Sequence, residues 1–169
     1  MKEANSPSDR HRFLADVMLG SLARWLRILG YDTWYDNQID DDDLISRCQI
    51  DNRIALTRER RLTQRRALKR SLLITNEELG HQLREVLSFT GDGIDERLVL
   101  TRCLECNSNL ESVKRTDVRD LVPAYVYRTQ SRFRNCPECN RIYWAGTHRR
   151  RMMERIQRLL DSRTETSEL

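Results

Sequence analysis

Two Cys-x-x-Cys pairs constrain the fold of this chain more than any other feature. The first pair is Cys103 and Cys106, the second is Cys136 and Cys139, and an asparagine follows each pair. Four thiolates in two such knuckles are the usual ligands of a structural, tetrahedral zinc site. Asparagine is the residue that best replaces glycine where a tight knuckle needs a positive φ. The cysteines therefore predict one structural zinc ion per chain, in a small C-terminal ribbon.

The alternative to zinc is a redox iron site, because rubredoxin-type proteins also use two such knuckles. An iron site of that kind is expected in an acidic, aromatic module, whereas residues 127–158 are rich in arginine and contain few acids. No apolar run approaches the ~20 residues of a membrane helix, and residues 1–12 contain no secretory signal. We expect a cytoplasmic protein without membrane contact, where paired cysteines bind metal rather than form disulfides.

Strand and helix patterns alternate along the first half of the chain. Strands are predicted at 12–17, 32–35, 53–57 and 71–75, and helices at 21–29, 43–50, 59–70 and 77–89. Gly30 is expected to end the first helix with a positive φ, and Asp40 or Asp41 to cap the second. This alternation predicts an α/β fold with a parallel sheet flanked by helices.

Two units follow from this pattern. Residues 12–96 are predicted to form the α/β domain, and residues 97–162 the ribbon with a closing helix at 147–161. Residues 1–11 and 163–169 are expected to be disordered. In open parallel sheets, ligands bind at the carboxyl ends of the strands, so Asp16, Asp36 and the Thr57-Arg58-Glu59 corner should converge there.

Acidic residues are concentrated between Asp36 and Asp43, where aspartates make up most of the segment. Like charges so close together repel one another, and a divalent cation such as Mg²⁺ or Mn²⁺ relieves that repulsion. Such a cation can activate water for phosphodiester cleavage. Helix capping and a solvated acidic loop would also explain Asp42. They explain Asp16 less well, because it lies in an otherwise apolar strand.

Several motifs occur in a fixed order over about residues 12–155. They are FLADVMLGSLARWLRILGYDTWYDN, DDDDL, ALTRERRL, the first Cys-x-x-Cys pair and CPECNRIYWAGTH. In this order they resemble the ribonuclease-like domain found at the C-terminus of the mutator-seven exonuclease and as stand-alone bacterial and archaeal proteins. The resemblance implies a PIN-like nuclease fold that carries a zinc ribbon.

The resemblance also implies a catalytic site for Mg²⁺ or Mn²⁺ that hydrolyses RNA. Asp16 would be the ligand from the first strand, Asp41 or Asp43 the acid from the next helix, and Thr57 a supporting residue. The family's Thr-Arg-Asp signature ends here in Glu59, which reaches one methylene farther than aspartate. Because of this change, an RNA- or ribosome-binding adaptor without catalysis is the alternative function.

Basic side chains give the chain a formal net charge of +4, and their excess lies after residue 96. Such a field suits a polyanion, and each phosphate that is neutralised makes binding dependent on salt. Tyr143 and Trp144 are expected either to stack on unpaired bases of RNA or to pack the ribbon. The predicted RNA-binding residues are Arg58, Arg60, Arg61, Arg65, Arg66, Arg132, Arg134, Tyr143, Trp144, His148, Arg149 and Arg150.

Overall fold

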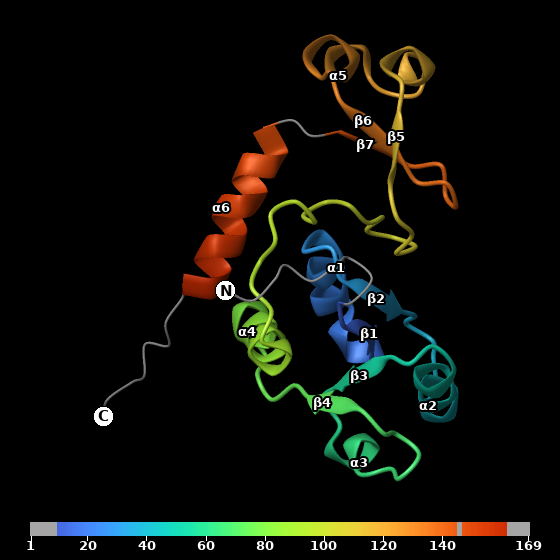
Figure 1. Cartoon of the computed structure of the whole chain (residues 1–169), viewed down its shortest axis with the longest axis vertical. Helices are drawn as coiled ribbons and strands as arrows, with labels where there is room; N and C mark the ends of the chain where they lie inside the picture. The colour runs from blue at the N-terminus through green and yellow to red at the C-terminus, as the bar shows by residue number, and fades with distance from the viewer. Residues whose placement is uncertain (1–9, 145–146, 162–169) are drawn as a thin grey trace.

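A parallel sheet of four strands forms the centre of the computed structural model, which describes residues 10–144 and 147–161 (Figure 1). The strands are β1 (Arg12–Ala15), β2 (Asp32–Tyr35), β3 (Ile54–Thr57) and β4 (Ser71–Leu73). Their order is β2-β1-β3-β4, and every neighbouring pair is parallel. The predicted parallel α/β sheet is therefore confirmed.

Helices cover both faces of this sheet. They are α1 (Gly20–Ile28), α2 (Asp41–Ile50), α3 (Arg60–Thr63) and α4 (Leu79–Thr90). Alternate strand residues point to opposite faces, so Phe13 and Ile54 pack with α1 and α4, whereas Leu14 and Ala55 pack with α2 and α3. Gly30 follows α1 with a φ of 86°, as predicted.

The closing helix α6 (Thr147–Asp161) has the predicted bounds and packs beside α4 (Figure 1). Its Ile156 is buried in the same cluster as Leu83 and Val86 of α4. Arg84 of α4 donates hydrogen bonds to the carbonyl oxygens of Leu159 and Leu160, at 3.0 and 3.1 Å. The helix thus adds to the core of the sheet, although it follows the ribbon in the sequence.

The largest departure from prediction lies between β3 and β4. A helix was predicted over residues 59–70, but only α3 (Arg60–Thr63) is helical. Leu62 and Leu68 are both buried in the cluster on the α2 side of the sheet. Six residues apart, they would point about 120° away from each other on a continuous helix. The chain leaves the helix after Thr63, and both leucines can then face the sheet.

The ribbon is a separate antiparallel sheet of β5 (Glu111–Val113), β6 (Phe133–Asn135) and β7 (Ile142–Trp144). A 3-10 turn (Arg115–Val118) and α5 (Ala124–Thr129) lie in the segment between β5 and β6. Val113, Phe133 and Trp144 are aligned across the strands and pack on one face with Val118 and Val122. The opposite face carries the aligned residues Ser112, Arg134 and Tyr143.

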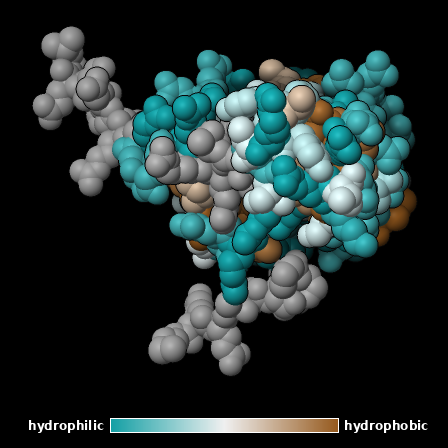
Figure 2. Space-filling model, turned by 90° about the horizontal axis from the view of Figure 1, so that it is seen from above, coloured by the Kyte–Doolittle hydropathy of each residue, from teal (hydrophilic) through white to brown (hydrophobic). Residues whose placement is uncertain are grey.

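Hydrophilic side chains dominate the ribbon end of the molecule, which Figure 2 views from above. This fits a chain in which 33% of residues are charged. Within residues 10–144 and 147–161, no helix combines the length and the apolar character needed to cross a membrane. The predicted disordered ends at residues 1–9 and 163–169 lie outside the described residues. Arg10 and His11, also expected to be disordered, contact the body: Arg10 donates to the carbonyl oxygens of Leu29 and Gly93.

Candidate metal centre and acidic edge

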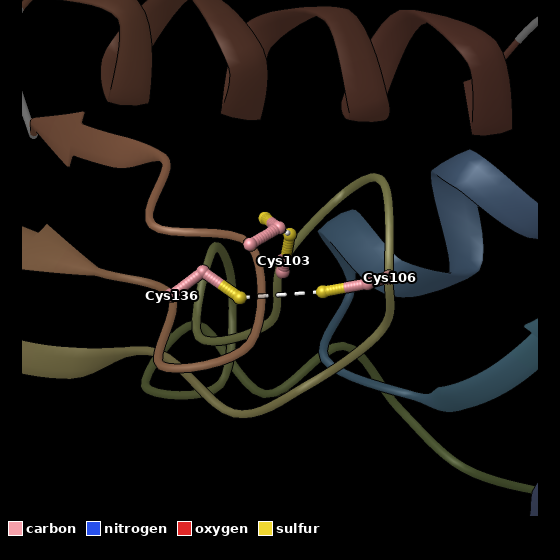
Figure 3. A group of neighbouring side chains, drawn as sticks. Cys103, Cys106 and Cys136 are labelled. Atoms are coloured by element: carbon pink, nitrogen blue, oxygen red, sulfur yellow. Dashed lines mark hydrogen bonds between the residues drawn. The ribbon is translucent and has the colours of Figure 1, made fainter.

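The two cysteine knuckles face each other and form a cluster of four sulfur atoms (Figure 3). All four Sγ atoms lie within 4.8 Å of one another. The distance from Cys103 to Cys139 is 3.6 Å, and from Cys106 to Cys136 it is 3.2 Å. Sulfurs bound to one tetrahedral metal at ~2.3 Å would lie about 3.8 Å apart. The four thiols therefore fit a single metal ion.

Backbone conformation supports both knuckles in the way predicted. The φ angles of Asn107 and Asn140 are 70° and 57°. Their N–H groups donate to the carbonyl oxygens of Cys103 and Cys136, at 3.1 and 2.9 Å. Each asparagine therefore closes a tight turn around its cysteine pair, and the positive φ that we inferred from the sequence is confirmed.

Tyr143 supports the cluster from β7. Its hydroxyl accepts a hydrogen bond from the Leu104 N–H at 3.2 Å and lies 3.1 Å from Cys103 Sγ. Burial tends to raise the pKa of Cys103, but the Cys106 N–H and the Tyr143 hydroxyl outweigh it and lower that pKa to about 6. Burial raises the pKa of Cys136 to about 12. The sequence alone contained no sign of the contact between Tyr143 and the sulfur.

Arg27 of α1 fastens the first knuckle to the α/β body. Its side chain is buried, and its Nη1 donates to the carbonyl oxygens of Leu104 and Glu105 at 2.9 and 2.8 Å. Its Nε donates to the carbonyl oxygen of Thr33 at 2.9 Å. Burial lowers the pKa of this guanidinium. Our sequence reasoning missed Arg27, because an arginine on an amphipathic helix is ordinarily exposed.

Asn107 makes a second attachment, at the beginning of β2. Its Nδ2 donates to Asp32 Oδ1 at 2.7 Å, and its Oδ1 accepts from the Thr33 N–H at 3.0 Å. Arg53 Nη1 donates to the same Asp32 oxygen at 2.6 Å. Burial tends to raise the pKa of Asp32, but the hydrogen bonds from Arg53 and Asn107 hold it below its ordinary value. The side chain of Asn107 thus pairs with the edge strand of the sheet.

Asp16 is the most enclosed acid at the carboxyl edge of the sheet. It follows β1 directly, outside the strand that we predicted to include it, and is only 7% exposed. Thr57 Oγ1 donates to Asp16 Oδ2 at 2.7 Å and accepts from the Glu59 N–H at 3.0 Å. The Asp16 N–H donates to the carbonyl oxygen of Leu56 at 2.9 Å. The buried threonine thereby links the end of β1 to the residue that opens α3.

The other predicted acids lie around the same edge but are exposed. Helix α2 runs from the carboxyl end of β2 back toward β3, so its first turn places Asp41 and Asp43 at this edge. Asp40 is the N-cap, since its Oδ1 accepts from the Asp43 N–H at 2.8 Å. Glu59 is also exposed. In the described part of the chain, only the cysteines form a group of three or more side chains that could hold a metal ion, and none of these carboxylates belongs to such a group.

The predicted RNA-binding arginines after β3 fall into two groups. Arg58 pairs with Glu77 at 2.9 Å and Arg65 with Asp42 at 2.6 Å, which ties this segment to the acidic edge. The remaining members of the set, Arg60, Arg61 and Arg66, are exposed.

The predicted RNA-binding residues of the ribbon are also divided. Arg132 is exposed, whereas Trp144 packs with the apolar cluster of the ribbon, the alternative that we had left open. Arg134 donates to the carbonyl oxygen of Leu100 at 3.2 Å. The side chains of His148, Arg149 and Arg150 lie outside the described residues.

The metal centre and the acidic edge lie at opposite ends of the central strands. The first knuckle contacts the amino end of β2, whereas Asp16 follows the carboxyl end of β1. Strands of four residues rise about 13 Å at ~3.3 Å per residue. A metal ion held by the cysteines would therefore lie far from Asp16.

The sequence model of the family described as the Mut7-C RNAse domain matches residues 11–156. No curated protein and no solved structure matches the chain. The family match covers the sheet, the cysteine knuckles and much of α6.

Proposed function

Because the chain belongs to the Mut7-C RNAse domain family, we propose that it is a metal-dependent ribonuclease that hydrolyses phosphodiester bonds at the carboxyl edge of its parallel sheet. The observation that carries this proposal is the environment of Asp16. The carboxylate is almost buried, and no lysine, arginine or histidine within the described ranges lies within ion-pair distance of it. A buried carboxylate needs a compensating positive charge, and a divalent cation would supply one.

Thr57 positions Asp16 for this role. Its hydroxyl donates to one carboxylate oxygen, which leaves the other oxygen, Oδ1, for a ligand. Carboxylate oxygens are the ligands that Mg²⁺ and Mn²⁺ prefer. Asp41 or Asp43 and Glu59 would complete the set, since their exposed side chains can turn toward Asp16. The bound ion would supply the Lewis acidity that lowers the pKa of water and stabilises the leaving oxygen.

Arginines near this edge would hold the RNA. Arg60, Arg61 and Arg66 lie in the same segment as Glu59 and are exposed, so they can contact phosphates without entering the carboxylate set. Phosphate contacts of this kind orient a strand but do not read its sequence. The substrate would be RNA that is single-stranded or has unpaired bases. The predicted stacking residues Tyr143 and Trp144 contact Cys103 and the apolar cluster of the ribbon, so the arginines rather than these rings would carry the RNA contacts.

The cysteine cluster would hold a structural zinc ion rather than a catalytic one. Its four ligand positions are filled by protein thiols, so no position is open for water or substrate. An ion bound there would contribute folding energy to the ribbon. Through the hydrogen bonds of Arg27 and Asn107, which join the first knuckle to the α/β body, the ion would also stabilise the body.

A second candidate function is an RNA-binding adaptor without catalysis, with a ribosome or another RNA-protein particle as its partner. The observation in its favour is that Asp16, Asp41, Asp43 and Glu59 do not form a compact ligand group in the described part of the chain. Glutamate at position 59, in place of the family aspartate, also permits this alternative.

Cleavage of labelled single-stranded RNA in Mn²⁺ distinguishes the two functions. The parent protein and the Asp120→Asn variant, which alters an exposed acid of the ribbon, should cleave the RNA. Asp16→Asn should retain its fold and lose cleavage by at least about a hundredfold, the lower range for loss of one catalytic group. RNA binding without cleavage by the parent would favour the adaptor. Elemental analysis should find one zinc per chain, and stoichiometric iron would contradict the zinc proposal.

A further inference from the structure

A cleft of about 550 Å³ lies between the α/β body and the ribbon. It is lined by Gly30, by residues of the segment after residue 97, and by β5 and β6. The polar residues that line it are Thr101, Arg102, Asn109, Ser112 and Arg134. Two leucines complete the lining, which contains no carboxylate and no aromatic ring.

The two arginines are held in place by carbonyl oxygens rather than by acids. Arg102 Nε donates to Gly30 at 3.2 Å and its Nη1 to Asn107 at 2.8 Å, while Arg134 Nη1 donates to Leu100. Neither guanidinium forms a salt bridge with a carboxylate in the part of the chain that the structure describes. Asp32, whose charge acts on Arg102, is already bound by Arg53 and Asn107. The cleft therefore carries positive charge that protein acids do not neutralise.

The backbone segments that line this cleft are held in place by defined contacts. Gly30 allows the chain near Leu98 to pass close by, since a Cβ at Gly30 would lie 2.5 Å from the Leu98 carbonyl oxygen. Ser112 and Arg134 are cross-strand partners on the face of the ribbon opposite its apolar cluster. Arg102 and Asn109 form a β-bridge beside them. The side chains that offer hydrogen-bond donors in the cleft therefore project from backbone segments that are hydrogen-bonded to one another.

We propose that this cleft binds a backbone phosphate of the RNA strand, at a distance from the scissile bond. The inference rests on the proposed function for the identity of the ligand and for the place of cleavage. Two guanidinium groups with hydroxyl and amide donors around them suit an oxyanion such as phosphate. A free nucleotide is less well suited, because the lining offers no aromatic ring on which its base could stack.

The position of the cleft sets a minimum length for productive RNA. Gly30 and the first knuckle lie toward the amino ends of the strands, and Asp16 lies at the carboxyl edge. The strands alone rise about 13 Å between these two ends, which corresponds to at least about four nucleotides at ~3.4 Å each in a stacked strand. RNA shorter than this can reach Asp16 or the cleft, but not both.

Binding of labelled single-stranded RNA to the full chain tests the cleft directly, in an Asp16→Asn background without added Mn²⁺. Arg134→Ala removes one guanidinium, and Asn109→Asp adds an acid to the wall without altering an arginine. Arg119→Ala is the matched control, an exposed arginine of the ribbon outside the cleft. Arg134→Ala and Asn109→Asp should each weaken binding about tenfold or more relative to the control. Arg134→Ala should also reduce the slope of log K against log salt by about 0.7.

The proposal would be overturned if both cleft variants bound RNA within about twofold of Arg119→Ala. Such a difference is too small for the loss of a charged hydrogen bond. If elemental analysis shows that Arg134→Ala has lost its metal, Asn109→Asp alone decides. Competition by 5′-AMP as effective as by RNA would assign the cleft to a free nucleotide and also overturn it. Cleavage of RNA by the parent protein is measured separately. If the cleft variants lose RNA binding but the parent does not cleave RNA, the proposed phosphate site stands and the proposed ribonuclease activity is refuted.

Discussion

Replacement of Thr57 by valine tests the arrangement around Asp16. Valine has nearly the same shape as threonine but cannot donate to Asp16 Oδ2 or accept from the Glu59 N–H. Thr57 is fully buried, so water cannot replace either hydrogen bond without a rearrangement. The substitution therefore leaves an almost buried carboxylate and a backbone N–H without their partner.

The expected loss follows from these two contacts. A hydrogen bond to a charged group contributes about 1.5–3 kcal/mol, and a neutral one about 1 kcal/mol. Thr57→Val should therefore lower the free energy of unfolding by about 2.5–4 kcal/mol. Thr57→Ser retains the hydroxyl and loses one methyl group, which costs about 1 kcal/mol in a core. Serine should thus be tolerated better than valine, although valine is the more apolar residue at a buried position.

Urea denaturation of the metal-bound protein at neutral pH, followed by circular dichroism, measures both variants. A valine variant as stable as the parent, or more stable than the serine variant, would refute the assigned role of the hydroxyl. Under the proposed function the same order should appear in RNA cleavage: Thr57→Ser retains most of kcat, and Thr57→Val loses it while RNA binding persists.

Three further predictions concern the metal centre and its attachment to the body. Cys103→Ser should reduce bound metal from one ion per chain to near zero by elemental analysis and lower the Tm, because the apo ribbon loses the folding energy of the ion. Asp32 has a pKa below its ordinary value of 3.8, so it stabilises the fold above that pH, and this contribution is lost as the pH falls through the folded-state pKa. The stability difference between the parent and Asp32→Asn, in urea titrations, should therefore be large at neutral pH and shrink in acid; a difference that grows in acid would contradict the sign. Gly30→Ala should cost more unfolding free energy than Gly91→Ala: both glycines have positive φ, which costs about 1–2 kcal/mol for alanine, but only at Gly30 does the added Cβ meet backbone. Equal losses at the two glycines would show that the close approach of Leu98 is unimportant.

The sequence by itself determined the features that depend on local chemistry and periodicity. Cysteine spacing identified a four-thiol group that fits a metal, and the asparagines after each pair indicated the positive φ that the structure shows. Alternating strand and helix patterns predicted the parallel sheet, because a strand buried on both faces needs a continuous apolar run. Asp16 stands at the end of such an apolar run, where a charged residue is unexpected, and the sequence therefore indicated it as a candidate site residue.

Tertiary structure alone decided how distant residues meet. Leu62 and Leu68 must face one sheet, which ends the predicted basic helix after one turn. Arg27 contacts the knuckle across more than seventy positions of sequence, and Tyr143 reaches Cys103 across forty. Such contacts leave no periodic signal in the sequence, because each depends on how two elements that are distant in the sequence pack against each other. For the same reason, only the structure could show that the cysteine cluster and Asp16 lie at opposite ends of the central strands.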